Sequence, residues 1–494
     1  MPVHWRLCFL PALIAGAALP AKAAAPDIPP LRAVVRQFQI QGNTVFPSAT
    51  LAATLRGFLE RPLTVEEIYA AADCVAAYYH AHGYVLATVA LPVQPLDSGI
   101  LLLQVREGRI GALRIEGNRR YDAARLRRWL TPVAPGAVYR RSDLESGLMA
   151  LNALPGLSAR AVLEPAGDPD VSNIVVHVQE TAAAGILGAD NYGRRRLGRY
   201  RATAAAELDN PLRVGDQLSV TALHTDGNRL GYGELGYRLP LRARGPELAL
   251  SYGRALFSVP GNGGGWDRIG RAELRWPLLR TAADLASLAA GGADVRANAN
   301  LAGDATDATD VRLAVLRAEF RHEGDDGARS RVTLEARSNF TRARSAPDAH
   351  AEALRLELDA ARSRPLPAIR AGFELYARLD GVYSPDPLPG AEQFAAGGSE
   401  SVRAYPPVEA RGDRGLAATL GIRQLLREGI VVRAYLDGAQ VRALQTSLPA
   451  RTTLLGAGFG CDVGYQGWSS RLDFALPLGD GGHSRVLASL AARF

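Results

Sequence analysis

The sequence of 494 residues has few cysteines and few long apolar runs, and both shortages exclude a class of protein. Of its three cysteines, Cys8 lies in the first apolar stretch, while Cys74 and Cys461 lie far apart in segments of different character. We therefore expect no disulfide framework. Past residue 25, no run approaches the roughly 18 consecutive apolar residues that a membrane-spanning helix needs. This excludes a bundle of transmembrane helices, but it does not exclude a β-barrel.

The surplus of positive charge is also small. Lys22 is the only lysine among 57 basic residues, which stand against 50 acidic ones, and the formal net charge is +7. The charge falls to +5 if Arg6 and Lys22 are removed with an N-terminal signal, and no basic run carries interleaved aromatic residues. We therefore expect no nucleic-acid partner. A hydrophobic content of 47% with a mean hydropathy of −0.04 excludes an intrinsically disordered chain.

Catalytic and metal-binding motifs are missing as well. The sequence has no H-E-x-x-H, no Walker loop and no G-x-S-x-G, so we expect neither an enzyme nor a cofactor. Asp304, Asp307 and Asp310 recur at a spacing of three, which matches no known calcium loop. We interpret them as part of a solvated loop and expect no metal site.

The first feature that is present is a processing signal. Arg6 precedes an apolar stretch from Leu7 to Leu19, and Ala21-Lys22-Ala23 then gives an A-x-A cleavage pattern ahead of a proline-rich segment. These features predict an export signal over residues 1–23 rather than a retained anchor.

Two copies of one unit follow, at residues 34–109 and 110–181. Ile40-Gln41-Gly42-Asn43 recurs as Ile115-Glu116-Gly117-Asn118, and the same order of elements follows each copy. A capping box from Thr64 to Glu67 begins the second helix of the first copy. Each unit is predicted to be β-α-α-β-β, a small sheet covered on one face by two helices. The glycine of the repeated turn is expected to adopt a positive φ.

The elements predicted for the two units have the following bounds. The first has strands at 34–40, 85–91 and 100–105 and helices at 49–59 and 64–82. The second has strands at 112–116, 159–163 and 173–178 and helices at 122–130 and 142–154.

From residue 182 to residue 494 the pattern changes to strands of about ten residues separated by turns rich in Gly, Pro, Asp and Asn. Leu354 to Asp359 alternates strictly between apolar and polar residues, a pattern that fits either a water-soluble sandwich or a membrane barrel. Sixteen strands are predicted, near residues 184–193, 198–209, 215–224, 230–239, 246–257, 267–277, 282–296, 309–321, 329–341, 350–361, 367–381, 415–426, 430–442, 452–464, 467–478 and 484–494.

The number of strands and the lengths of their links favour the barrel. Sixteen is even, as a single-chain bacterial barrel with both ends on one side requires. Tight links at 427–429 and 466–467 fall on one side, and long ones, including 304–310 and the longest at 382–414, fall on the other. The last strand alternates up to Phe494, which resembles the signal read by the barrel-insertion machinery. We expect two α+β domains followed by a 16-stranded antiparallel transmembrane β-barrel.

Several motifs resemble those of one family. Residues 91–110 are similar to the first polypeptide-transport-associated (POTRA) domain of the two-partner secretion exporters, the haemolysin-activator family. Residues 151–156 resemble the second POTRA domain, and residues 190–193 and 209–212 resemble the start of the barrel. Residues 397–405 are close to the family's G-G-x-x-S-V-R-G-Y. The resemblance covers nearly all of the chain that follows the export signal.

The resemblance implies a lock inside the pore. In such exporters the sixth extracellular loop, here 382–414, folds back into the barrel, and an Arg at its tip pairs with an Asp of an F-x-D-x-G strand motif. An Arg suits this role because its planar fork can hold a carboxylate with two bonds. The alternative is a solvated loop arginine with an unrelated aspartate in the lumen. The residues that match are Gly397 and Gly398, the tip residues Ser401, Val402, Arg403, Ala404 and Tyr405, and Tyr435, Asp437 and Gly438 on the wall.

Three positions depart from the family's pattern. Ala404 and Ala439 replace glycines, and Tyr435 replaces a phenylalanine, so the packing of the loop tip on the wall is expected to differ. Some exporters also carry an N-terminal helix that plugs the pore. Too few residues separate the predicted cleavage site from the first strand for such a helix, so we expect none.

The resemblance also implies a location and a function. The chain is expected in the bacterial outer membrane, in contact with its lipid, with the POTRA domains in the periplasm. There these domains would capture an extended segment of one large unfolded partner, haemolysin-like or adhesin-like, by strand addition. The barrel-assembly machinery is a second expected partner. The alternatives are a factor that inserts other barrels, which usually has a different number of POTRA domains, and a passive porin, which lacks the repeated N-terminal domains.

Overall fold

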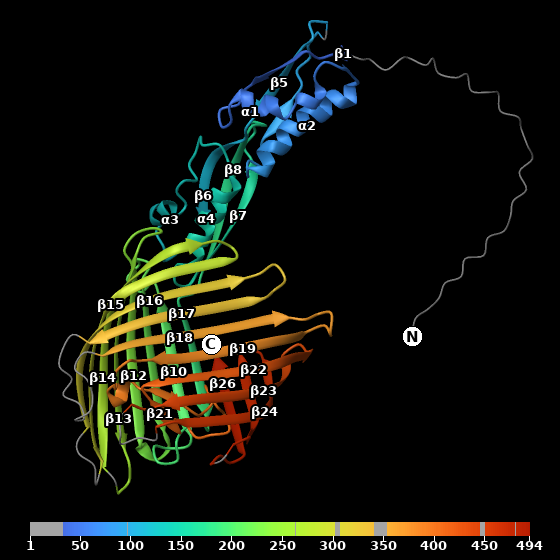
Figure 1. Cartoon of the computed structure of the whole chain (residues 1–494). Coiled ribbons are helices and arrows are strands. Elements are labelled where there is room, and N and C mark those ends of the chain that lie inside the picture. The colour runs from blue at the N-terminus through green and yellow to red at the C-terminus, as the bar shows by residue number, and fades with distance from the viewer. Residues whose placement is uncertain are drawn as a thin grey trace, which may run out of the picture. The chain divides into compact units, whose positions relative to one another are not determined.

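The computed structural model describes residues 33–95, 97–261, 263–301, 307–339, 353–444, 450–479 and 481–494. The predicted export signal, and the segment in which no plug helix is expected, lie outside the described residues. The chain divides into two compact units after Gly108, and each is described by itself. Figure 1 shows both units and labels many of their elements.

The first unit is a small sheet covered by helices. Its elements are β1 (Ala33–Val34), β2 (Gln37–Gln41), α1 (Ser48–Ala53), the 3-10 turn η1 (Arg56–Phe58), β3 (Pro62–Leu63), α2 (Val65–Ala81), β4 (Thr88–Ala90) and β5 (Ile100–Arg106). The sheet order is β2-β5-β4, with β2 parallel and β4 antiparallel to β5. Leu55, Val75, Tyr79 and Leu103 are fully buried in its core.

The capping box predicted for the long helix is confirmed. The Thr64 side chain accepts a bond from the Glu67 amide, and the Glu67 carboxylate accepts one from the Thr64 amide. The single helix predicted over 49–59 is wrong, because α1 ends early and η1 follows it. The Thr54 hydroxyl donates to the Leu51 carbonyl at 2.7 Å, and Gly57 is a poor helix former, so both disfavour a continuous helix.

The strand predicted over 85–91 is shorter than expected. Residues 84–87 form a turn, closed by a bond from the Ala87 amide to the Tyr84 carbonyl at 3.0 Å, so β4 begins only at Thr88.

The second unit begins with the same order of elements. It has β6 (Arg109–Glu116), α3 (Ala123–Trp129), α4 (Arg141–Asn152), β7 (Leu157–Pro165) and β8 (Val171–Glu180). The sheet order is β6-β8-β7, with β6 parallel and β7 antiparallel to β8. The prediction of a repeated β-α-α-β-β unit is confirmed.

The repeated turn needs glycine for two reasons. Gly42 and Gly117 have φ values of +83° and +88°, which confirms the predicted positive φ. A Cβ on Gly42 would also lie 2.2 Å from the Val105 carbonyl oxygen, and one on Gly117 would lie 2.3 Å from that of Val178. In both units the turn therefore lies directly against the backbone of the last strand.

Replacing Gly117 with alanine should destabilise residues 109–181 more than replacing Gly136. Gly136 has a similar φ of +85°, but a Cβ there would meet nothing within 4 Å, so Gly136→Ala should cost only the left-handed strain of about 1–2 kcal/mol. Gly117→Ala adds the overlap with Val178 and should cost at least about 2 kcal/mol more. Hydrogen exchange of β8 in the full-length chain measures the difference. Equal losses of protection would contradict the close-approach explanation.

A glutamate holds the repeated turn in each unit, buried in the first unit and half-buried in the second. Glu107 is 5% exposed, and its carboxylate accepts bonds from the Thr44 and Val45 amides at 2.6 and 2.7 Å and from the Tyr79 hydroxyl at 2.9 Å. Glu180 accepts bonds from the amides of residues 119–121 at 2.7–3.1 Å. Burial alone would raise the pKa of Glu107, but the hydrogen bonds from Thr44, Val45 and Tyr79 outweigh burial and lower the pKa below its ordinary value.

Glu107→Gln should loosen the first unit, and the effect should depend on pH. The uncharged glutamine oxygen accepts the Thr44 and Val45 bonds more weakly than the carboxylate does, so at neutral pH the protection of residues 44–45 against hydrogen exchange should fall by about tenfold. Because the folded-state pKa is lowered, the stabilisation by Glu107 is complete above the ordinary value of 4.5 and is lost as the pH falls through the lowered pKa. The difference between wild type and variant should therefore shrink below pH 4.5. A pH-independent difference would contradict this role of the carboxylate.

Sixteen antiparallel strands then close into a barrel, as predicted, with β26 paired to β9. They are β9 (Ala183–Asp190), β10 (Arg201–Asp209), β11 (Gln217–Thr225), β12 (Leu230–Pro240), β13 (Glu247–Ser258), β14 (Gly263–Arg280), β15 (Asp284–Leu301), β16 (Asp307–Glu323), β17 (Arg329–Asn339), β18 (Leu354–Pro365), β19 (Phe373–Tyr383), β22 (Arg414–Arg427), β23 (Ile430–Arg442), β24 (Thr452–Tyr465), β25 (Trp468–Pro477) and β26 (Arg485–Arg493). In the parts of the chain that the structure describes, no helix is long and apolar enough to span a membrane.

Two details of the predicted strands are wrong. β19 begins at Phe373 rather than near 367, because Pro367 cannot donate to a ladder and residues 366–373 form a closed turn. Asp307 and Asp310 lie on β16, not in a loop, and Asp310 makes an ion pair with Arg296 across the β15–β16 ladder at 3.3 Å. Asp304 lies outside the described residues.

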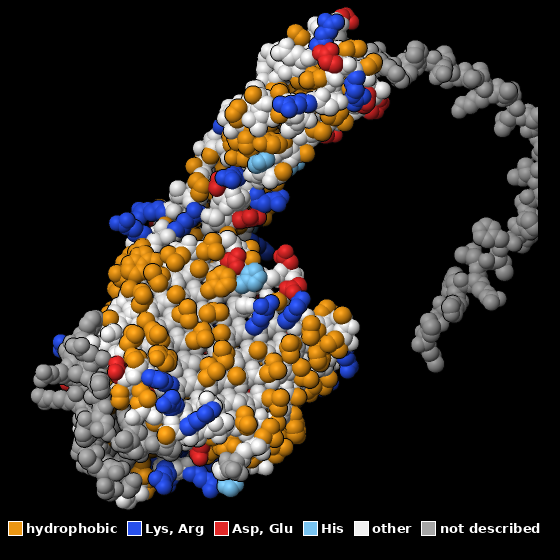
Figure 2. Space-filling view, viewed as in Figure 1, with side chains coloured by type: hydrophobic (Ala, Val, Ile, Leu, Met, Phe, Trp, Pro, Cys, Tyr) orange, Lys and Arg blue, Asp and Glu red, His pale blue; other side chains and the backbone are white. Residues whose placement is uncertain are grey.

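The wall alternates between an apolar outer face and a largely polar inner face. On β22 and β23, Leu416, Leu420 and Leu436 are exposed, while the alternate residues Ala417 and Asp437 are buried. Figure 2 shows hydrophobic side chains spread over the outer face of the barrel that it displays. This alternation assigns every strand residue to the outside or the lumen.

Candidate functional site

The longest link of the barrel folds back into the lumen. It runs from Ser384 to Asp413, between β19 and β22, and contains a small hairpin of β20 (Phe394–Ala396) and β21 (Ala410–Gly412). Its tip residues pack in one buried cluster with side chains on the inner face of β22–β25. That cluster includes Val402, Ala404, Tyr405, Ala417, Ala439, Leu454 and Ala475. The loop tip is therefore held against one sector of the wall.

Arg403 and Asp437 meet at the centre of this contact. Arg403 Nε lies 2.9 Å from Asp437 Oδ2 and Nη2 lies 2.8 Å from Oδ1, which makes a two-bond fork, and the Arg403 amide adds a third bond at 3.2 Å. The Thr419 hydroxyl on β22 donates to the same carboxylate at 2.8 Å. The side chains of Arg403 and Asp437 are 11% and 1% exposed. The alternative of an exposed loop arginine and an unrelated aspartate does not describe this geometry.

Tyr435 forms a platform under Arg403. The guanidinium carbon lies 3.2 Å from the centre of the Tyr435 ring. The ring occupies the space over Gly458, where a Cβ would lie 2.4 Å from it. A glycine on β24 is therefore needed for the tyrosine to lie flat along the wall.

A second network of charges continues the site along the wall. Asp473 lies 3.9 Å from Arg403 Nη1, accepts a bond from Arg433 Nε at 3.1 Å, and forms an ion pair with Arg433 Nη2 at 2.8 Å. Arg433 also pairs with Asp462, which accepts from Arg471 at 2.8 Å. Asp437 and Asp473 are almost completely buried, so their charges depend on these arginines. Leaving one member of such a pair without its partner costs about 3–5 kcal/mol.

The loop glycines set the turn that presents Arg403. Gly397 and Gly398 have φ values of +104° and +90°, and a Cβ on Gly397 would lie 2.3 Å from the Pro406 carbonyl oxygen. The turn is closed by a bond from the Gly398 amide to the Tyr405 carbonyl at 2.9 Å. Ala404 is not among the described residues with positive φ, so alanine fits where the family's pattern has glycine. Its Cβ lies 3.0 Å from where a Cβ on Gly456 would stand.

A second anchor ties the base of the loop to another part of the wall. Glu392 is 6% exposed and accepts from Arg337 on β17 at 3.0 Å. Its backbone carbonyl accepts from Arg355 on β18 at 2.9 Å. Sequence reasoning did not find these residues. Their inward positions follow from strand alternation, but their partners depend on how the loop folds.

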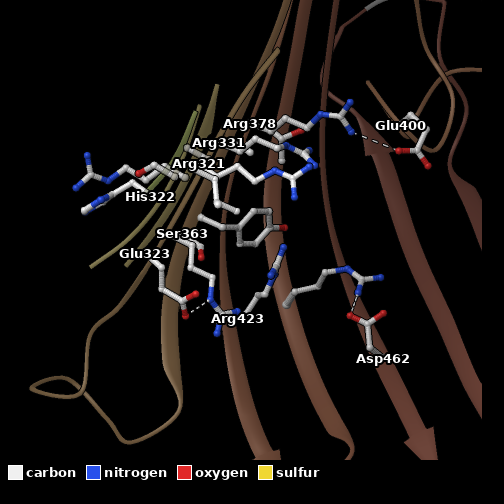
Figure 3. A pocket seen from close by; sticks show the side chains of 18 of the residues that line it. Arg321, His322, Glu323, Arg331, Ser363, Arg378, Glu400, Arg423 and Asp462 are labelled. Atoms are coloured by element: carbon white, nitrogen blue, oxygen red, sulfur yellow. Dashed lines mark hydrogen bonds and ion pairs between the residues drawn. The ribbon is translucent and has the colours of Figure 1, made fainter. Parts of the chain in front are cut away.

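A charged cavity of about 690 Å³ lies beside the lock. Figure 3 shows Arg321, Arg331, Arg378 and Arg423 lining it, with Glu400 of the loop reaching Arg378. Most of these arginines are paired: Arg378 with Asp380 at 2.9 Å, Arg331 with Asp359 at 3.6 Å and Arg423 with Glu374 at 3.7 Å. The lumen here is thus polar and mixed in charge.

The remaining sequence-predicted residues lie near the lock or at the barrel seam. Ser401 lies in the same loop tip, and Gly438 follows Asp437 on β23 and faces outward. Phe494 is 75% exposed and packs on Gly185 of β9, where the two backbones exchange bonds at 2.9 and 3.1 Å. The structure therefore brings Arg403, Tyr435 and Asp437 together, and it places Phe494 apart from them.

Comparisons with known families cover most of the chain. A family model described as "Haemolysin secretion/activation protein ShlB/FhaC/HecB" matches residues 170–463. A model described as "POTRA domain, ShlB-type" matches residues 33–108, and one described as "Surface antigen variable number repeat", a POTRA model, matches residues 109–181.

Individual relatives are similar in sequence or in fold. The chain is 26% identical to the outer membrane transporter CdiB of Dickeya dadantii over 39% of its length and 34% of the relative's. It is 31% identical to the hemolysin transporter protein ShlB of Serratia marcescens over 42% and 36%. These matches span about a third of the relatives' lengths. In fold, the chain is similar to CdiB from Escherichia coli, with a TM-score of 0.74 and 20% identity over 97% of this chain and 93% of that one.

Proposed function

Because the chain belongs to the haemolysin secretion/activation family of ShlB, FhaC and HecB, we propose that it is an outer-membrane pore for one large unfolded partner protein. The partner would enter from the periplasm, pass through the barrel and fold at the cell surface. One relative named as a hemolysin transporter supports a haemolysin-like partner, and an adhesin-like partner is the other candidate. Residues 1–23 act as the export signal, and the final strand is read by the barrel-assembly machinery.

The observation that carries this proposal is a loop folded into a closed barrel, with the charge at its tip held by a single contact between side chains. The Arg403–Asp437 fork is a single pair of side chains, and the loop shares no continuous ladder with the wall. A carrier of folded cargo would need a wide permanent channel, whereas an extended chain needs only the space that a displaced loop leaves. Release of Arg403 would open that space.

The repeated N-terminal units supply a place to capture the partner. β7 is an edge strand of its sheet and has nine residues, and Val162 and Leu163 on it are 44% and 38% exposed. An extended segment of the partner can pair with such an edge through backbone bonds while its side chains contact these apolar residues. Because the sequence has no nucleotide-binding motif, folding of the partner outside the cell is the proposed driving force.

Deletion of the gene in its own bacterium tests the function. One large protein should disappear from the cell surface and medium, as measured by quantitative mass spectrometry, and should return when the wild-type chain is supplied. The abundance of other outer-membrane barrels should stay unchanged. A general loss of barrels would instead support the assembly-factor alternative, and an unchanged surface would contradict export altogether.

A further inference from the structure

The outer wall of the barrel carries a row of arginines. On β13, Arg254 is exposed between Tyr252 and Leu256, which are 51% and 50% exposed, while the alternate Gly253 and Ala255 are buried. Across the ladders, Arg254 is paired in register with Arg268 of β14, Arg268 with Arg296 of β15, and Arg296 with Asp310 of β16. Four neighbouring strands thus present charge on the apolar face of the barrel.

The arginines of this outer row, which we define as Arg254, Arg268, Arg296 and Arg312, differ in whether a carboxylate lies beside them. Arg296 lies 3.0 Å from Asp294 and 3.3 Å from Asp310, and Arg312 lies 3.6 Å from Asp294. Among the residues that the structure describes, Arg254 and Arg268 make no ion pair. Among the described residues, the guanidinium groups of Arg254 and Arg268 therefore have no carboxylate beside them, which leaves these two positive charges for a ligand to neutralise.

The row lies at one border of the apolar belt. Below Arg268, the outward residues of β14 are Gly270, Ala272, Leu274 and Trp276, and Trp276 marks the opposite border. Eight residues separate Arg268 from Trp276, which is about 26 Å along the strand and about 20 Å along the membrane normal for a tilted strand. An arginine at the bilayer midplane of a barrel costs about 2–4 kcal/mol, but near the interface the cost is close to zero. The row therefore belongs among the headgroups of the outer leaflet.

An apolar groove begins beside Arg254. It has a volume of about 730 Å³ and lies on the outer face of β9–β13. Its floor is made of small side chains, Ala204, Ala222 and Gly233, between the larger Leu187 and Leu256. Arg254 lines the same groove, so one end of it is charged, while the rest is largely apolar with Thr203, His224 and Tyr232 as its polar members.

We propose that this surface binds a phosphorylated lipid of the outer leaflet. The phosphate lies against Arg254 and Arg268, whose planar forks match its oxygens, and one acyl chain occupies the groove. The two unneutralised arginines and the adjoining apolar groove correspond to the two parts of such a lipid. This inference goes beyond the export function, because it concerns the wall that faces the membrane rather than the lumen.

Native mass spectrometry of the full-length protein tests the site. The protein in a neutral detergent is mixed with lipid A carrying two phosphates, with the same lipid after removal of the phosphates, or with inorganic phosphate. Wild type should retain the phosphorylated lipid at least tenfold better than the dephosphorylated one. The double variant Arg254→Gln with Arg268→Gln should lose at least fivefold of that retention. A matched control is Arg362→Gln with Arg364→Gln, two exposed outward arginines near the other end of the barrel, which should leave retention unchanged.

A third variant tests the groove. A Cβ on Gly233 would be 4.0 Å from the nearest atom, so Gly233→Leu should fill the groove without disturbing the wall and should reduce lipid retention severalfold. Equal retention by wild type and the Arg254/Arg268 variant would overturn the proposal, as would equal retention of the two lipids. Tight binding of inorganic phosphate alone would show an anion site without lipid and would also overturn it. Heat-dependent gel mobility checks that every variant is folded, and none of these results depends on export of a partner.

Discussion

Replacing Arg403 with alanine should reduce delivery of the partner to the cell surface by at least about tenfold while the barrel still inserts and folds. The change leaves the Asp437 carboxylate, 1% exposed, without its two-bond partner, at a cost of about 3–5 kcal/mol if the loop stays in place. The loop should therefore leave its place against the inner wall of the barrel. The pore should then no longer have distinct closed and open states. Quantitative immunoblots of surface and periplasmic fractions measure the outcome.

A second ion pair of the same loop provides the control. Glu400 contacts Arg378 at 3.3 Å, but its side chain is 81% exposed, so the pair contributes little. Glu400→Ala should leave delivery unchanged. Arg403→Lys should remain impaired, because an ammonium cannot reproduce the fork or the stacking on Tyr435. Normal delivery by Arg403→Ala would refute the role of the loop, whereas an equal defect in Glu400→Ala would point to a general disturbance.

Replacing Gly458 with alanine should impair delivery of the partner nearly as strongly as Arg403→Ala does, although Gly458 is not one of the charged residues at the loop tip. The new Cβ would lie 2.4 Å from the Tyr435 ring and 2.5 Å from the Phe474 carbonyl oxygen, so the ring must leave its place on the wall. Such overpacking costs about 1–3 kcal/mol, and it removes the platform on which Arg403 rests. We expect about a tenfold loss of delivery with a barrel that still shows heat-dependent mobility.

The same strand offers a control for this change. A Cβ on Gly464, also on β24, would meet its nearest atom, the Trp468 carbonyl oxygen, at 3.9 Å, which is an ordinary contact. Gly464→Ala should therefore deliver the partner normally. A double variant of Gly458→Ala with Tyr435→Ala removes the ring overlap but keeps the overlap with the Phe474 carbonyl oxygen, so its loss should be smaller than the sum of the two single losses. A clearly additive loss would show that Gly458 acts by some route other than Tyr435.

The barrel could be predicted from sequence because its signal is local and repeated. Each strand has its own alternation of apolar and polar residues, so sixteen separate segments each indicated a barrel strand. An error at one end of a strand, such as that of β19, did not change the number of strands. The helix expected over 49–59 failed for the opposite reason. The end of this helix depends on one hydrogen bond from the Thr54 hydroxyl and on Gly57, and the spacing of apolar residues reveals neither of them.

The site was only partly predictable. Arg403 and Asp437 could be chosen because two motifs of a known family contain them. Glu392, Arg337 and Arg355 carry no such motif, and arginine accounts for nearly all of the chain's 57 basic residues, so no one arginine stands out. Their meeting depends on the register of β17 and β18 and on the path of the loop between β19 and β22. Sequence pattern predicts which side of the wall a residue faces, but not which partner it meets across the lumen.

The two anchors of the loop, at Glu392 and at Arg403, have a consequence for the shape of the barrel. They attach one segment to β17 and β18 and to β23, which are separated along the wall by β19 and β22. The loop therefore acts as a chord across an arc of the cylinder and fixes the curvature of that arc. When the loop is withdrawn, the wall from β17 to β23 is free to change its curvature. Opening the pore and making its rim more deformable are therefore one mechanical event.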